Sequence, residues 1–132
     1  MTTQLEKEIR EQPQALARTL EGSRAAVENL CKDMAARDIC HVMIAARGTS
    51  DNAGVYAKYI LPAFNGLPVA LAAPSLYTFY KKPPRLKNVL VLGISQSGQS
   101  DHSAEMLSGA RSQGALTAAI TTDLASPIAK KV

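Results

Sequence analysis

Apolar positions along the chain form four short continuous runs, and polar residues follow each of them. The runs occupy His41–Ala46, Leu67–Ala72, Val89–Ile94 and Leu116–Thr121. A continuous apolar run of this length is typical of a strand that is buried on both faces of a parallel sheet. Helical patterns separate the runs. Strands that alternate with helices predict a three-layer α/β/α fold, a doubly wound parallel sheet with helices on both faces.

The helices expected between these strands have recognisable ends. One helix follows the first strand and should end at Asn65-Gly66, after Pro62 has weakened it. A short helix is expected over Pro74–Tyr80, and a longer one over Asp101–Gln113, stopped by Gly114. After the fourth strand, Ser126-Pro127 predicts another helix, with serine as the N-cap and proline at the first helical position.

Residues 1–36 are expected to form a helical lead-in. Thr3 and Glu6 have the spacing of a capping box, which predicts a short helix that ends before Pro13, where a second helix begins. One apolar stripe runs along the second helix, made of Leu16, Leu20, Val27, Leu30 and Met34. The stripe is consistent either with packing on the same domain or with packing on a second copy or a second domain.

Composition narrows the class of protein. A chain of 132 residues suits one soluble domain, and no apolar run approaches the ~18–20 residues of a membrane span. The formal charge of +4 favours an anionic partner, but scattered basic residues and 5% aromatics argue against nucleic acid. Cys31 and Cys40 lack metal-ligand spacing, so we expect reduced, partly buried thiols in a cytoplasmic protein without metal or cofactor.

Two polar turns are expected to form one site. Gly48-Thr49-Ser50 follows the first strand, and Ser95-Gln96-Ser97-Gly98 follows the third. In a sheet of order 2-1-3-4 these two strands are neighbours, and their following helices lie on opposite faces. The crevice between their carboxyl ends is the switch point, where ligands bind in such folds. The two turns should therefore border the same crevice.

Hydroxyls, an amide and backbone N–H groups at two helix N-termini suit a phosphate group. The alternative is that these serines and threonines only cap helices, as they do routinely. The sequence has neither the P-loop pattern nor the dinucleotide-binding glycine pattern, and no G-x-S-x-G is present. Modest, reversible binding of a phosphorylated metabolite is the resulting hypothesis.

At these residues the chain resembles the SIS (sugar isomerase) domain family. It is most similar to the isomerase half of glucosamine–fructose-6-phosphate aminotransferase and to related amino-sugar-phosphate isomerases and deaminases. The motifs that carry the resemblance are Glu8–Pro13, Gly48-Thr49-Ser50 with Ala57-Lys58-Tyr59, Ile94–Ser100, and Ser126–Ala129. The resemblance implies a flavodoxin-like fold in which 37–132 is a phosphosugar-binding SIS domain, with four of five strands present and its C-terminal end truncated.

The resemblance also implies roles for single residues. Ser95, Gln96, Ser97 and Ser100 would hold the phosphate around Gly98, and Thr49 and Ser50 beside Gly48 would contact the sugar phosphate from the other side. The base and the ring-opening groups of the family would lie outside this sequence, so no catalytic residue is predicted. We therefore expect binding with little or no turnover. A regulatory phosphosugar sensor is the alternative, and a homodimer or a second SIS domain is the expected protein partner.

Overall fold

The structure of the chain is a computed structural model that describes residues 2–132. It consists of two compact units, one that runs as far as Asp33 and one from Met34 to Val132. Each unit is described by itself. No helix within the described residues is both long enough and apolar enough to cross a membrane.

A single long helix, α1 (Gln4–Ala36), forms the first unit and ends in the second. The predicted capping box is confirmed: the Glu6 N–H donates to Thr3 Oγ1 at 3.2 Å, and the Thr3 N–H donates to Glu6 Oε2 at 2.9 Å. The predicted break before Pro13 is wrong, because Pro13 lies inside the helix. Its missing N–H costs one helical hydrogen bond, which the good helix formers on both sides offset. No side chain of α1 is buried, so its apolar stripe remains a predicted packing surface.

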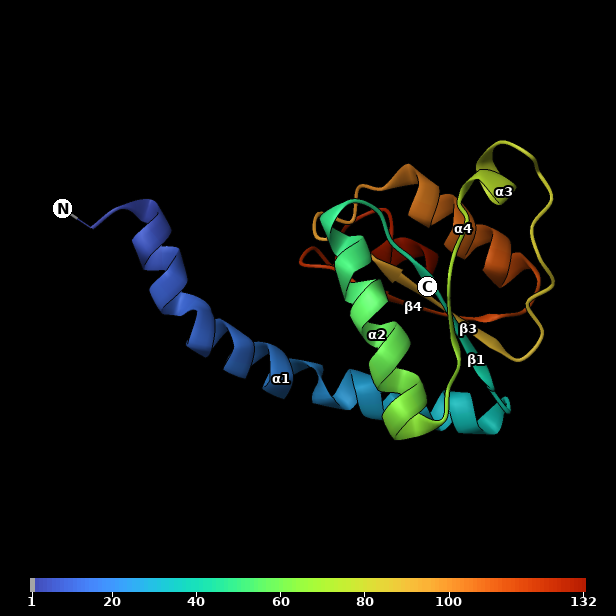
Figure 1. The fold of residues 1–132 in the computed structure, drawn as a ribbon, viewed down its shortest axis with the longest axis horizontal. Helices are drawn as coiled ribbons and strands as arrows, with labels where there is room; N and C mark the ends of the chain where they lie inside the picture. The colour runs from blue at the N-terminus through green and yellow to red at the C-terminus, as the bar shows by residue number, and fades with distance from the viewer. Residues whose placement is uncertain (1) are drawn as a thin grey trace. The chain divides into compact units, whose positions relative to one another are not determined.

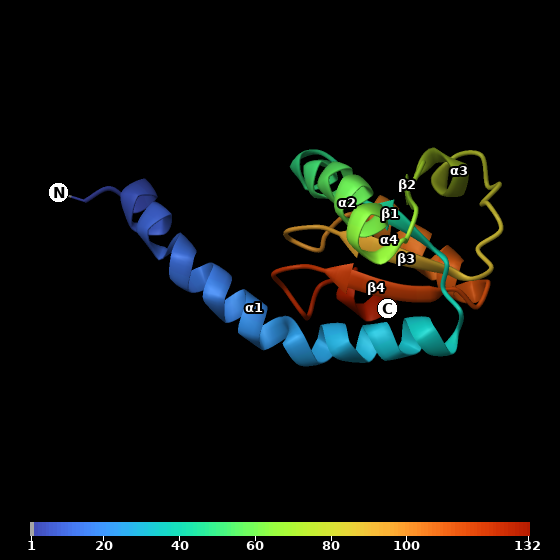
Figure 2. The ribbon, with the colours of Figure 1, turned by 60° about the horizontal axis from the view of Figure 1, so that its bottom comes forward.

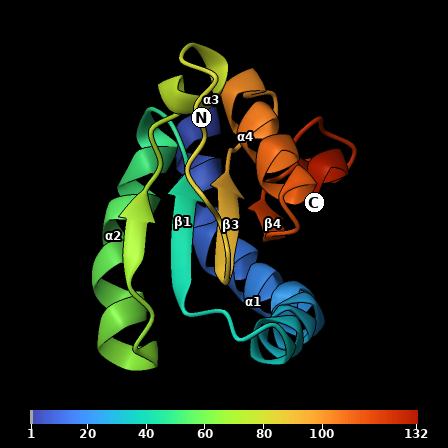
Figure 3. The same ribbon diagram turned by 90° about the vertical axis from the view of Figure 1, so that its right-hand side faces the viewer.

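The second unit is built on a four-stranded parallel sheet, as predicted. The strands are β1 (His41–Ala45), β2 (Val69–Leu71), β3 (Val89–Ile94) and β4 (Leu116–Ile120), in the order β2-β1-β3-β4. Every neighbouring pair is parallel, so all four carboxyl ends lie at one edge, where the arrowheads of Figure 3 point. The central pair, β1 and β3, has the register Ala45↔Gly93.

Helices cover both faces of this sheet. Helix α2 (Thr49–Asn65) lies on one face, and α3 (Ser75–Thr78) and α4 (Asp101–Ser112) lie on the other (Figures 1 and 3). Gly54 of α2 lies so close to β1 that a Cβ there would be 3.2 Å from Ile44 Cγ2. On the opposite face, Val91 packs in one buried cluster with Leu107 and Ala110 of α4. The doubly wound three-layer arrangement is thus confirmed.

The ends of the helices follow the expected residues closely. Gly66, with φ 65°, ends α2 in the left-handed conformation directly after Asn65, and Pro62 lies inside the helix. Gly114, with φ 79°, follows α4. Earlier in the chain, residues 79–88 form an extended connection from α3 to β3, visible in yellow in Figure 2.

Two smaller expectations are wrong. Ser126 does not cap a helix: its Oγ makes no hydrogen bond within the described residues, and the segment forms only the short 3₁₀ helix η1 (Ala129–Lys131). The reason is that Ser126 is buried against a neighbouring turn rather than exposed at a helix end. Cys31 and Cys40 are free thiols, as expected, but both are exposed rather than partly buried.

Candidate functional site

The turn between β1 and α2 is open and has few internal bonds. Gly48 precedes α2 with φ 59° and ψ −133°, a backbone conformation that side chains disfavour. No side chain caps the first N–H groups of α2. Gly48 and Thr49 are exposed, and Ser50 is half-buried. The helix therefore presents uncapped N–H groups together with two hydroxyls, which is a favourable arrangement for an anion.

The turn between β3 and α4 is, by contrast, folded on itself. Ser95 continues the sheet, because its N–H donates to the Ile120 carbonyl at 3.0 Å. Its side chain is only 8% exposed, and its Oγ accepts a hydrogen bond from the Gly98 N–H at 3.1 Å. Ser95 therefore closes the turn, and its hydroxyl has little surface left for a ligand.

The loop after β4 anchors the same turn from outside. The Gln96 carbonyl accepts three hydrogen bonds: from the Thr122 N–H at 3.0 Å, from Thr122 Oγ1 at 2.7 Å and from Thr121 Oγ1 at 3.2 Å. The Gly98 carbonyl accepts a further bond from the Ile128 N–H at 3.1 Å. With its carbonyl fixed in this way, the backbone of Gln96 is held while its side chain stays exposed.

Gly98 lies directly on a buried serine. Its φ is 67°, and a Cβ added there would be 2.1 Å from Ser126 Oγ and 2.3 Å from Ser126 Cβ. Ser126 is 1% exposed, and its Oγ is without a hydrogen-bond partner in the described part of the chain. Only glycine fits this position, for both backbone and steric reasons.

The remaining two serines of the turn differ in how free they are. Ser100 is the N-cap of α4: its Oγ accepts from the Ser103 N–H at 3.4 Å and lies 3.0 Å from Ser103 Oγ. Ser97 is exposed, and its Oγ has one long contact, the Gln99 N–H at 3.4 Å. Of the four serine and glutamine side chains expected at the phosphate, those of Ser97 and Gln96 are therefore the most available.

The two turns lie next to each other, as predicted. β1 and β3 are paired up to Ala45↔Gly93, and neighbouring strands are about 4.8 Å apart. Gly48 comes three residues after one member of this pair, and Ser95 two residues after the other. The helices that begin there, α2 and α4, cover opposite faces (Figure 3). The eight predicted residues are thus brought to one edge of the sheet, around its switch point.

The chemistry available at this edge is that of neutral donors. Arg47 is exposed and directly precedes Gly48, and His102 is half-buried in the first turn of α4. Asp51 lies in the first turn of α2. Elsewhere at this edge, serine and threonine hydroxyls, an amide and helix N–H groups predominate. Within residues 2–132, no group of three or more His, Cys, Asp or Glu side chains is placed to hold a metal ion.

A small buried core joins the end of β1 to α3 and α4. Ala45, at the end of β1, packs with Met106 of α4 and with Tyr77 of α3. Tyr77 is 5% exposed, and its hydroxyl has no hydrogen-bond partner among the described residues. Burial raises the pKa of Tyr77 above its usual value of 10.0, because tyrosinate would lose its hydration. This core thus connects the strand that leads into the first turn with the helix that follows the second.

Sequence reasoning did not find the residues that hold the second turn. The sequence placed Thr121 at the end of the fourth strand, gave Thr122 no role and predicted that Ser126 caps a helix. The threonine pair directly after an apolar run was the available signal, since hydroxyls there can reach the carbonyls of the neighbouring turn.

The comparisons with known proteins agree with this geometry. The model of the SIS domain matches residues 37–132. The glutamine–fructose-6-phosphate aminotransferase (isomerizing) of Xanthomonas campestris is 39% identical over 118 residues, which cover 85% of this chain and 19% of that protein. The Aquifex aeolicus protein of the same name is 34% identical over 92% of this chain and 20% of its own length. The chain thus spans about a fifth of these relatives.

Solved structures give the same assignment. A Silicibacter pomeroyi protein assigned as a phosphosugar isomerase matches with a TM-score of 0.89 and 38% identity, over 95% of this chain and 38% of that one. The C-terminal domain of glucosamine-fructose-6-phosphate aminotransferase from Francisella tularensis matches with a TM-score of 0.79 and 29% identity, over 95% of this chain and 36% of that domain. The chain therefore belongs to the SIS domain family and is homologous to the isomerase part of glucosamine–fructose-6-phosphate aminotransferase and to phosphosugar isomerases.

Proposed function

We propose that this chain binds the phosphate group of a sugar phosphate in the crevice between its two polar turns. The observation that carries the proposal is the β3–α4 turn. Five internal bonds, to Ser95 Oγ, the Gln96 carbonyl and the Gly98 carbonyl, hold its backbone and leave the side chains of Gln96 and Ser97 exposed. A site that is ordered before the ligand arrives loses less conformational entropy on binding.

The second wall of this site is the β1–α2 turn. Thr49 and Ser50 supply hydroxyls, and the uncapped N-terminus of α2 adds about half a positive charge. With Arg47 as the nearest cation, the phosphate is held mainly by hydrogen bonds. Ser95 and Ser100 act by shaping the turn, since their hydroxyls already bond Gly98 and Ser103. Binding of this kind is reversible and suits a metabolite.

The substrate class follows from the relatives. The names of these proteins refer to fructose 6-phosphate, glucosamine and phosphosugars. We propose that the full-length protein interconverts or aminates amino-sugar and ketose phosphates such as glucosamine 6-phosphate and fructose 6-phosphate. This chain supplies the phosphate half of that site. The base that moves the proton between adjacent carbons lies elsewhere in the protein, so the chain alone binds and does not turn over substrate.

The test is calorimetric titration of the 132-residue chain with fructose 6-phosphate, glucosamine 6-phosphate and fructose. Both phosphates should bind and fructose should not. Ser97→Ala should weaken binding, while Ser112→Ala, an exposed serine on the far end of α4, should leave it unchanged. Equal affinity of the chain and of its Ser97→Ala and Thr49→Ala variants would contradict the site. If the full-length protein binds phosphosugar but interconverts none, a regulatory sensor becomes the better description.

A further inference from the structure

A cavity of about 510 Å³ lies at the edge of the sheet opposite to the two turns. Its walls come from the three connections that lead into β1, β3 and β4. Parallel strands begin at the same edge, so residues that are far apart in the sequence converge there. The polar side chains in the wall are Arg37, Arg85, Lys87, Asn88 and Gln113. A volume of this size lies within the usual range of small-molecule sites, roughly 300–1,000 Å³.

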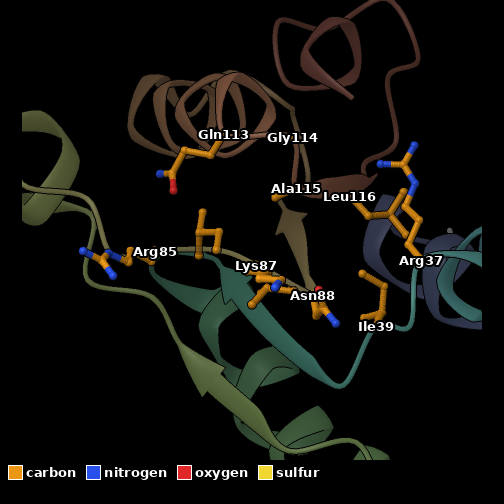
Figure 4. A pocket seen from close by; sticks show the side chains of 11 residues that line it. Arg37, Ile39, Arg85, Lys87, Asn88, Gln113, Gly114, Ala115 and Leu116 are labelled. Atoms are coloured by element: carbon orange, nitrogen blue, oxygen red, sulfur yellow. The ribbon is translucent and has the colours of Figure 1, made fainter.

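The cavity carries a concentrated positive charge. Three of its lining residues are Arg or Lys and none is Asp or Glu, in a chain whose net charge is +4. Figure 4 shows Arg85 and Arg37 on opposite sides, with Lys87 between them. The ion pair found within residues 2–132 joins Lys81 to Glu105, so the three cavity cations have no carboxylate within 4.0 Å. Such unpaired charges attract anions from solution.

Opposing charge at this edge is weaker. The C-terminus of α4 points here and contributes about half a negative charge, but the N–H groups of Gln113 and Ala115 donate to the Ala110 carbonyl and partly satisfy that end. Asp38 lies beside the cavity, where the Asn88 side-chain amide is 3.5 Å from its Oδ2. Three full positive charges therefore exceed the negative contributions.

The cavity also has a fixed, partly apolar wall. Leu86, Ala115 and Leu116 are buried, and each forms part of the lining. The side chain of Gln113 donates to the Pro84 carbonyl at 3.2 Å, which holds the segment that carries Arg85 and Lys87 against the end of α4. A ligand that fits must thus combine several negative charges with an apolar part.

We propose that this cavity is a second anion site, specific for a diphosphate joined to an apolar group such as a nucleoside diphosphate. The diphosphate lies against Arg85 and Lys87, which come from one segment, and the ring system lies against the apolar wall that includes Leu86 and Leu116. The site is separate from the phosphosugar crevice, because about six residues of strand, or about 20 Å, separate the two edges. The proposal does not depend on the phosphosugar assignment.

The test is calorimetric titration of the 132-residue chain with pyrophosphate, ADP and adenosine. ADP should bind more tightly than pyrophosphate, and adenosine should bind weakly. Arg85→Ala/Lys87→Ala should lower the affinity for ADP at least tenfold. The matched control, Lys58→Ala/Lys82→Ala, removes the same charge from exposed positions outside the cavity and should change the affinity less than twofold. All four side chains replaced in these two variants are exposed, and circular dichroism checks the fold.

Three outcomes would contradict the proposal. If the control pair lowers the affinity as much as the cavity pair, the attraction is general and no site exists. If ADP is displaced by fructose 6-phosphate, and Ser97→Ala rather than Arg85→Ala/Lys87→Ala abolishes ADP binding, the diphosphate occupies the crevice instead. Tighter binding of pyrophosphate than of ADP would show that the apolar group of the ligand contributes nothing to binding. Failure of phosphosugar binding alone would leave this second site unaffected.

Discussion

The two turns at the carboxyl edge use similar residues in different ways. The β1–α2 turn has a glycine at positive φ, uncapped helix N–H groups and exposed hydroxyls, and no atom of the described residues lies within 4 Å of a Cβ placed at Gly48. In the β3–α4 turn, Gly98 packs closely against Ser126, and the Gln96 carbonyl accepts three hydrogen bonds from the loop after β4. One turn is open, and the other is locked.

This difference predicts a division of labour within the proposed site, in which each turn has its own role in binding. The locked turn sets the position of the phosphate, because its backbone is fixed before any ligand binds. The open turn can adapt, so it suits contacts that vary with the sugar. Hydroxyl-rich sequences that look equivalent therefore differ in what substitution should do to them.

The largest expected effect comes from replacing the two glycines by alanine. Gly98→Ala adds a Cβ 2.1 Å from Ser126 Oγ at a positive φ, so overpacking and backbone strain together should lower the free energy of unfolding by about 2–6 kcal/mol. Gly48→Ala has strain without a clash and should lower it by about 1–3 kcal/mol. Urea unfolding of both variants measures the difference.

A second substitution identifies the cause. Ser126→Gly removes the atoms that the new Cβ would meet, so the double variant Gly98→Ala/Ser126→Gly should recover part of the loss relative to the sum of the single variants. An additive double variant would show that Ser126 does not make the second turn rigid.

Binding should be the next largest effect. Ser97→Ala should weaken the affinity for fructose 6-phosphate by about tenfold or more, since a hydrogen bond to a charged group contributes ~1.5–3 kcal/mol. Thr49→Ala should weaken it less, because the open turn orders its hydroxyl only on binding and this cost offsets part of the gain. Calorimetry compares the two, and a larger effect of Thr49→Ala would reverse the division of labour.

The sequence predicted the fold better than it predicted these differences. The apolar runs, the strand order and the convergence of the two turns follow from local pattern and from the rules of parallel sheets. The predicted helix break before Pro13 was wrong because a long run of helix formers outweighs one lost hydrogen bond. The predicted helix cap at Ser126 was wrong for another reason. Ser-Pro is a good helix start by local rules, whereas the burial of Ser126 depends on the position of Gly98.

The candidate site shows the same limit. The eight residues could be placed at one edge from the sequence, but the bonds of Gln96 to Thr121 and Thr122 depend on where the chain returns after β4. The basic residues of the cavity could not be predicted either, because they are scattered along the sequence. Arg37 is distant in sequence from Arg85 and Lys87, and the three line one cavity only because β1 and β3 begin side by side.

A smaller effect is expected from loosening the anchor of the locked turn. Thr122→Val removes the hydroxyl that donates to the Gln96 carbonyl at 2.7 Å and keeps the N–H bond and the side-chain shape. The free energy of unfolding should fall by about 0.5–1.5 kcal/mol, and the affinity for fructose 6-phosphate should fall a few-fold. Ser112→Ala, at the far end of α4, is the control. Unchanged affinity would mean that this bond does not position the turn.

The smallest effect should come from the core that joins the end of β1 to α3 and α4. Tyr77→Phe removes a buried hydroxyl without a partner, so stability should rise by up to about 1 kcal/mol while both turns keep their geometry and phosphosugar affinity stays the same. The raised pKa of Tyr77 gives the pH dependence. Above pH 10 the unfolded chain loses the tyrosine proton more readily than the folded one, so the stability of the unmodified protein falls as pH rises. The phenylalanine variant lacks this contribution, and its stability should fall less between pH 9 and pH 11 in urea unfolding. A change in the affinity of Tyr77→Phe for fructose 6-phosphate would show instead that the Tyr77 hydroxyl influences the proposed site.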